Sequence, residues 1–195
     1  LGAPGDRDFW ACPPLGEMIP RIRKYVDIAH RHGLKVISHL TVYIASDDYA
    51  ARHPRQRQWN VVSGKPAAGY PDTGFWKNAA TVCYNNPDFQ HTYRKSLKRL
   101  LAQTGVDGFM VDEVQFLSSA VDRWTCGCTH CRAEFTKDSG YVLPGGEDAK
   151  VILGDRNNAV FRAWFKGRSK QNGDFYELLR RTLDEQGGRD KILFG

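Results

Sequence analysis

Apolar residues recur along the chain with two periods, one typical of helices and one typical of strands. Spacings of three and four residues, as in Ile19, Ile22, Val26 and Ala29, predict amphipathic helices. Short runs rich in β-branched residues predict buried strands. The predicted helices cover about residues 15–32, 87–104 and 158–186, and the predicted strands cover 35–43, 106–114 and 191–194.

Residues at the ends of the predicted helices support these boundaries. Gly33 and Gly105 follow the first two helices, and glycine is the commonest residue just beyond a helix C-terminus. Asn86 is a good N-cap, and Pro87 suits the first helical position. Within the third helix, Gly173 predicts a break.

The order of the elements predicts an α/β fold. Each helix is followed by a strand and no hairpin is evident, a pattern that favours a parallel sheet. The long segments 44–82 and 115–157 follow strands, whereas the connections into the strands are short. A (β/α)₈ TIM barrel has this asymmetry, with function carried by loops at the carboxyl ends of its strands. We therefore predict one domain, 1–195, that covers the middle part of a TIM barrel; an open doubly wound sheet is the alternative.

Two adjacent carboxylates, Asp112 and Glu113, close the second predicted strand. Since side chains alternate along a strand, Asp112 shares a face with Met110, and Glu113 points the other way. A carboxylate at the carboxyl end of a barrel strand is typically catalytic. We predict Asp112 as the inward-facing catalytic residue and Glu113 as a second candidate. An ion pair between Asp112 and Lys77 is the structural alternative.

Clustered cysteines predict a metal site in a cysteine-rich loop at about residues 115–140. The spacing C-x-C-x-x-C offers three thiolates from one tight turn, and a structural zinc ion takes four ligands in a tetrahedron. Cys12 and His130 are alternatives for the fourth ligand, and free thiols or a disulfide are the alternative to a metal. The predicted zinc ligands are Cys83, Cys126, Cys128 and Cys131.

Composition narrows the class of protein. With 41% hydrophobic and 26% charged residues, the 195-residue chain is typical of globular domains, and no apolar run is long enough for a membrane helix. The net charge of +6 permits binding to nucleic acid, but the basic residues are scattered, so we expect no nucleic-acid partner. The first residues lack the pattern of a signal peptide. Together with a thiolate metal site, this favours a cytoplasmic location.

These motifs resemble the barrel of family 42 glycoside hydrolases and of uncharacterised glycosyl hydrolases related to them. The resemblance covers about residues 80–165 and rests on Cys83-Tyr-Asn-Asn-Pro, Gly-Val-Asp-Gly-Phe-Met-Val-Asp-Glu and the C-x-C-x-x-C run. It implies a TIM barrel that acts on galactoside-like or other carbohydrates, a structural zinc held by the four cysteines, and no organic cofactor. Family 42 enzymes carry Asn-Glu at this strand end, where this chain has Asp112-Glu113. The related hydrolases end the strand in Asp, which implies that Asp112 is the nucleophile or key carboxylate.

The sequence therefore favours a glycosidase that cleaves O-glycosidic bonds through a carboxylate pair, one member being Asp112 or Glu113. Two alternatives stay open: a non-catalytic carbohydrate-binding barrel and a zinc-stabilised interaction or nucleic-acid-binding module. Homo-oligomerisation is also left open. The candidate substrate-binding residues, at a strand end and in the long loop, are His39, Tyr43, Trp76, Lys77 and Asn78. For His39 the alternative is a hydrogen-bonded core histidine, and for Trp76 it is ordinary packing under the loop.

Overall fold

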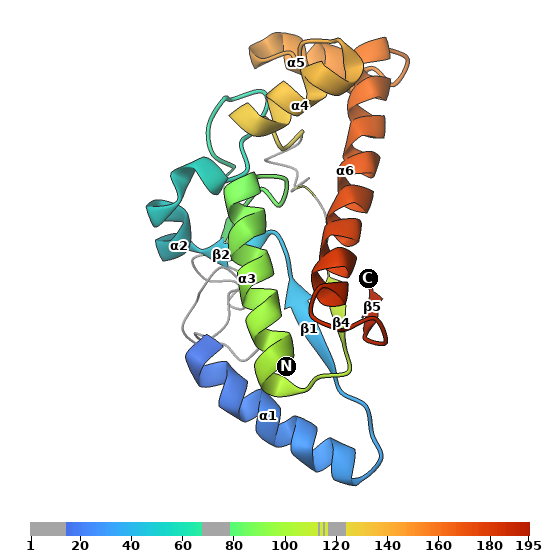
Figure 1. The fold of residues 1–195 in the computed structure, drawn as a ribbon. Helices are drawn as coiled ribbons and strands as arrows, with labels where there is room; N and C mark the ends of the chain where they lie inside the picture. The colour runs from blue at the N-terminus through green and yellow to red at the C-terminus, as the bar shows by residue number, and fades with distance from the viewer. Residues whose placement is uncertain (1–14, 68–78, 113, 115, 117–123) are drawn as a thin grey trace.

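The computed structural model describes residues 15–67, 79–112, 114, 116 and 124–195 (Figure 1). Helices and strands alternate through most of this part of the chain. In order, the elements are α1 (Leu15–Arg31), β1 (Ile37–Thr41), β2 (Ile44–Ser46), α2 (Asp47–Arg52), the 3-10 helix η1 (Pro54–Gln56), β3 (Ala79–Thr81), α3 (Pro87–Thr104), β4 (Gly108–Asp112), α4 (Thr129–Ser139), α5 (Gly146–Gly154), α6 (Ala159–Asp184) and β5 (Ile192–Phe194).

A three-stranded parallel sheet forms the centre of the molecule, and β4 is its middle strand. It pairs with β1 on one side and with β5 on the other, so the predicted parallel α/β arrangement is confirmed. The register sets Thr41 opposite Asp112 and Phe194 opposite Met110. The carboxyl ends of β1 and β4 therefore meet at one edge of the sheet.

The two faces of this sheet differ in their environment. On one face, Leu40, Phe109 and Val111 are buried in the main core, to which α1, α3 and α6 also contribute. Figure 1 shows α3 in front of β1, with α6 running beside β4 and β5. On the opposite face, Ile192 and Phe194 remain largely exposed, and Phe194 keeps 49% of its surface accessible.

The residues at the two ends of α3 cap and end the helix as the sequence predicts. The Asn86 side chain accepts hydrogen bonds from the backbone N–H groups of Asp88 and Phe89, at 2.9 and 3.2 Å, and so caps α3. Gly105 ends the helix with a φ of 73°, in the left-handed region. α3 therefore has the boundaries that the sequence predicted.

Three predictions about local structure were wrong. The segment 44–82 contains β2, α2, η1 and β3 instead of being irregular throughout, and β2 pairs antiparallel with β3. The segment 115–157 contains α4 and α5, and α5 was not predicted. Helix α6 runs unbroken through Gly173, since a glycine costs a helix only about 0.5–1 kcal/mol relative to alanine. Burial of the apolar side chains that follow Gly173 in α6 outweighs that cost.

A second, smaller core lies beyond the carboxyl ends of the strands. Val61 from the long segment packs there against Phe135 of α4 and Leu153 of α5. Figure 1 places α4, α5 and the start of α6 together at the end of the molecule opposite α1. None of the helices in the described ranges is long and apolar enough to cross a membrane.

Candidate active site and metal centre

Asp112 lies at the carboxyl end of β4 on the exposed face of the sheet. Its Oδ2 is 2.9 Å from Nε2 of His39, which comes from the neighbouring strand β1. Both side chains are accessible, 47% for Asp112 and 35% for His39. The parallel register explains the contact, because His39 is opposite Met110, one step before Asp112 on the same face.

The surroundings of Asp112 combine polar and apolar groups. Thr41 is its partner in the β1–β4 register, and Met110 is half-buried beside it. Tyr176 of α6 donates a hydrogen bond to the carbonyl oxygen of Val111, at 3.3 Å. Burial and the negative charge of Asp112 both raise the pKa of Tyr176. No sequence pattern singles out Tyr176, because none shows which residue of α6 reaches the end of β4.

Of the other predicted catalytic and substrate-binding residues, Tyr43 and His39 are described by the structure and the rest are not. Tyr43 is fully buried in the main core, so its side chain is not accessible to a substrate in this structure. His39 is not a core histidine, since it is exposed and bonded to Asp112. The remaining four lie outside the described residues: Glu113, Trp76, Lys77 and Asn78.

The four predicted ligand cysteines come together in one buried cluster. All four Sγ atoms lie within 4.8 Å of one another, and the Sγ of Cys83 is 3.5 Å from that of Cys131 and 3.9 Å from that of Cys128. A zinc ion about 2.3 Å from each sulfur of a tetrahedron sets the sulfurs about 3.8 Å apart. The cluster therefore has the size of a four-thiolate metal site, and all four cysteines are free of disulfides.

Backbone N–H groups point at the sulfurs, as thiolates require. Trp59 and Cys128 each direct a backbone N–H to Sγ of Cys126, at 3.3 and 3.4 Å, and Cys131 directs its own to Sγ of Cys128, at 3.5 Å. Burial raises the pKa of Cys126, whereas hydrogen bonds from the other three cysteines lower the pKa of Cys131. Four thiolates in one buried cluster would repel one another. A divalent cation bound between them would balance part of this negative charge, so the cluster suits such an ion.

The cysteine loop is anchored to three other parts of the chain. The backbone N–H of Gly127 donates to the carbonyl of Trp59 at 2.6 Å. Arg168 of α6 donates to the carbonyl of Cys126 at 2.7 Å, and its guanidinium lies 4.2 Å from the centre of the Phe116 ring. Phe116 also packs against the cysteines. Phe116 follows Asp112 by four residues in the sequence, so the cluster contacts a residue close to the strand end.

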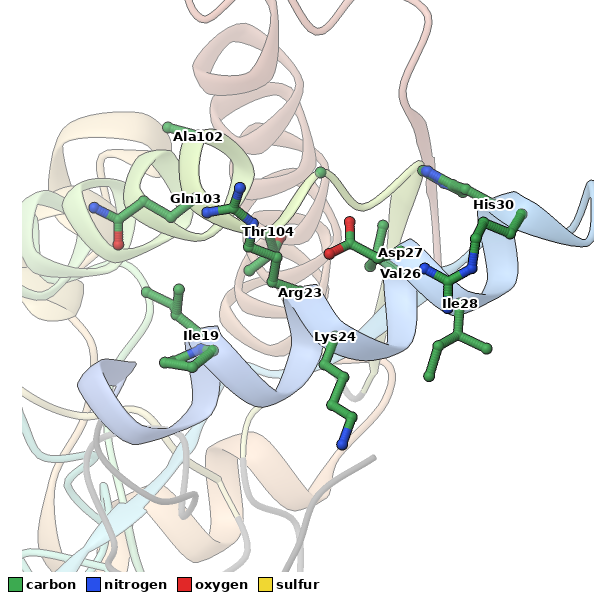
Figure 2. Close-up of a pocket in the computed structure, with 13 residues that line it drawn as sticks. Ile19, Arg23, Lys24, Val26, Asp27, Ile28, His30, Ala102, Gln103 and Thr104 are labelled. Atoms are coloured by element: carbon green, nitrogen blue, oxygen red, sulfur yellow. The ribbon is translucent and has the colours of Figure 1, made fainter.

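Two surface hollows differ in their position relative to the candidate site, and only the first borders it. One, of about 600 Å³, borders the cluster, with Cys128 and His130 in its wall. His130 is not among the four clustered ligands, so the cysteines form the candidate metal site without it. The other is a groove of about 930 Å³ between α1 and the end of α3, shown in Figure 2 with Arg23, Asp27 and Gln103. It borders the amino end of β4, away from Asp112.

Comparisons with known proteins support the fold. No family model and no curated protein matches the chain. Among solved structures, it is similar to alpha-L-fucosidase isoenzyme 2 from Paenibacillus thiaminolyticus, with 14% identity and a TM-score of 0.59 over 89% of this chain. It is also similar to the PgaB (BpsB) glycoside hydrolase domain from Bordetella bronchiseptica, with 18% identity and a TM-score of 0.57 over 84% of this chain.

The chain spans only part of these neighbours, 22% of the first and 42% of the second. At these identities the likeness concerns the fold alone. The chain thus has a glycoside hydrolase-like fold, and the comparisons do not single out family 42.

Proposed function

We propose that the chain belongs to the catalytic barrel of a glycosidase and that Asp112 is a reacting carboxylate. One observation carries the proposal: Asp112 is exposed at the carboxyl end of the central parallel strand, on the face that the helices leave uncovered. In a TIM barrel this face is the interior and this strand end is the active-site end. The fold shared with two glycoside hydrolases supports the same interpretation.

The chemistry requires two carboxyl groups with different roles. One carboxylate faces the anomeric carbon, where positive charge develops, and a carboxylic acid gives its proton to the leaving oxygen. Asp112 takes the first role in this proposal. Adjacent side chains on a strand diverge, so Glu113 is proposed as a supporting residue, and the proton donor comes from another strand end.

The proposed substrate is a carbohydrate that lies across the exposed face of the sheet. Trp76, Lys77 and Asn78, from the long segment after β1, are proposed to contact it, and an aromatic ring such as Trp76 suits the apolar face of a sugar. The apolar side chains of Ile192 and Phe194 on this face fit the interior of a barrel completed by further strands.

We further propose that the four cysteines bind a structural zinc ion. Four thiolates close the coordination sphere and leave no position for substrate, so the ion would stabilise the loop without taking part in the reaction. Its proposed effect is to fix Phe116 between the cysteine cluster and Arg168 of α6.

The proposal is tested by hydrolysis of nitrophenyl glycosides that differ in sugar and anomer. The full-length wild-type protein should cleave at least one of them, and Asp112→Asn should lower kcat by about 10²–10⁴-fold. Asp190→Asn is the matched control, because Asp190 is exposed near the amino end of β5, away from the site. An Asp112→Asn variant as active as the wild type contradicts the assignment. Binding of sugars without hydrolysis supports the non-catalytic carbohydrate-binding barrel instead.

A further inference from the structure

We infer that His39 is a positioning residue that fixes the orientation of the Asp112 carboxylate and leaves Oδ1 as the oxygen that faces the substrate. This inference rests on the proposed function and sharpens it. It gives Asp112 the role of the carboxylate that faces the anomeric carbon, and it assigns the proton donor to another residue. His39 then acts through Asp112 and does not serve as a sugar ligand.

The direction of the hydrogen bond follows from the chemistry of the two groups. An ionised carboxylate can only accept, so Nε2 of His39 must carry the proton and donate it to Oδ2 across 2.9 Å. Hydrogen bonds that a carboxylate accepts favour its charged form. A carboxylate held in this way is poorly suited to deliver a proton to a leaving group, and well suited to face a centre that becomes positive.

The contact also fixes the orientation of the carboxylate. Within the described part of the chain, His39 is the one group that hydrogen-bonds to the Asp112 carboxylate. It comes from the neighbouring strand of the same sheet, so Oδ2 is held by a side chain that projects from the same face as Asp112. Oδ1 is left without a partner among the described residues, on a side chain that is 47% exposed. This is the oxygen that a substrate can reach.

A second histidine–aspartate pair in the same sheet provides a natural comparison. Nε2 of His30 lies 2.9 Å from Oδ2 of Asp107, the same separation as in the His39–Asp112 pair. That Oδ2 also accepts the backbone N–H of Val36 at 2.8 Å, and the Asp107 side chain is only 21% exposed. The His30–Asp107 pair therefore ties the chain together at the amino ends of the strands, whereas the His39–Asp112 pair leaves an oxygen available.

Kinetics of variants at His39 separate positioning from sugar binding. His39→Leu should lower kcat by about 10–100-fold, the scale on which misplaced reacting groups lose rate, with little change in KM. His39→Gln, whose amide can donate near the position of Nε2, should keep a larger share of kcat. His30→Leu is the matched control and should leave both constants unchanged. A raised KM with unchanged kcat in His39→Leu overturns the inference and makes His39 a sugar ligand.

Nitrogen NMR of the imidazole gives a readout that does not depend on activity. In the full-length wild-type protein, His39 should carry a hydrogen-bonded proton on Nε2, and this signal should disappear in Asp112→Leu. A proton found only on Nδ1 in the wild type overturns the inference. Wild-type protein that cleaves none of the glycosides overturns the proposed function and this inference with it, whereas a KM-only effect in an active enzyme overturns this inference alone.

Discussion

At Gly127 the cysteine loop passes so close to Val61 that no side chain fits between them. A Cβ atom added there would lie 2.9 Å from Cγ2 and 3.0 Å from Cα of Val61. Gly127 is the residue between the first two cysteines of the C-x-C-x-x-C run. In the structure a glycine at this position lets two backbones pass close together. They are joined by the hydrogen bond from the N–H of Gly127 to the carbonyl oxygen of Trp59.

Gly127→Ala is therefore expected to destabilise the protein by about 1–3 kcal/mol, the usual cost of overpacking a filled site. The backbone of Val61 cannot move aside as a flexible side chain would. Gly173→Ala is the control, because no heavy atom lies within 4 Å of an added Cβ in α6, and it should stabilise by about 0.5–1 kcal/mol. Chemical denaturation measures both changes, and equal stability of the two variants contradicts this explanation.

Single residues differ in how far the sequence predicts their environment. The alternation of a strand correctly places Asp112 on the face of Met110, because that is a property of one strand. The contact with His39 depends on the register between β1 and β4, which no local pattern encodes. The burial of Tyr43 was missed for the same reason, since it is set by the helices that cover the sheet.

At the scale of elements, Asp107 joins α1, β1 and β4. Its carboxylate accepts hydrogen bonds from His30 of α1 and from the backbone N–H of Val36, just before β1. Burial alone would raise the pKa of Asp107, but the two hydrogen bonds and the charge of His30 lower it. The pair closes the amino ends of the strands, opposite the candidate site.

The lowered pKa predicts how stability depends on pH. A carboxyl group with a folded pKa below its unfolded value, about 3.9, adds stability above that value and loses it as the pH falls through the folded pKa. Asp107→Asn should therefore cost about 1 kcal/mol near pH 7, where a charged acceptor is replaced by a neutral one. Urea denaturation should show the difference from wild type shrinking below about pH 4. An unchanged difference at pH 3 argues against this role.

The long elements were predictable and the short ones were not. The two helices α1 and α3 and the three strands of the parallel sheet follow from apolar periodicity and helix caps. β2, β3 and α2 have only three to six residues each, too few for a period to emerge. Ser46 illustrates the local signal that was available, because its hydroxyl accepts the backbone N–H of Tyr49 and starts α2. Serine is equally common in irregular loops, so this signal alone does not predict a helix.

At the scale of the molecule, the cysteine cluster connects the main core to the smaller one. Cys83 precedes α3, which packs in the main core, and Cys131 lies in α4, which packs in the smaller core. The grouping of Cys126, Cys128 and Cys131 was predictable from spacing, whereas Cys83 was one of three candidates for the fourth position. Their convergence depends on the pairing of the cysteine loop with Trp59 and Val61, which the sequence does not reveal.

The full-length protein, purified without chelator, is expected to contain one zinc ion per chain. Cys83→Ser should abolish this metal and lower the free energy of unfolding by about 4 kcal/mol, the linkage expected when free zinc exceeds Kd a thousandfold. Cys12→Ser is the control, because Cys12 was the alternative ligand in the sequence and lies outside the described residues. Native mass spectrometry with metal analysis distinguishes the variants. Metal-free wild-type protein, or loss of zinc from Cys12→Ser, contradicts the proposed ligand set.

The most direct measurement for the molecule as a whole is chemical rescue of Asp112→Ala. A dinitrophenyl glycoside, of the sugar that the wild type cleaves, needs little help to release its leaving group, so the variant lacks only the carboxylate. Formate or azide can occupy the vacated space beside His39 and supply the missing anion. We predict that hydrolysis by Asp112→Ala is slow and rises with the concentration of either anion. A variant that keeps the wild-type rate, or whose slow rate responds to neither anion, would show that Asp112 is not the reacting carboxylate.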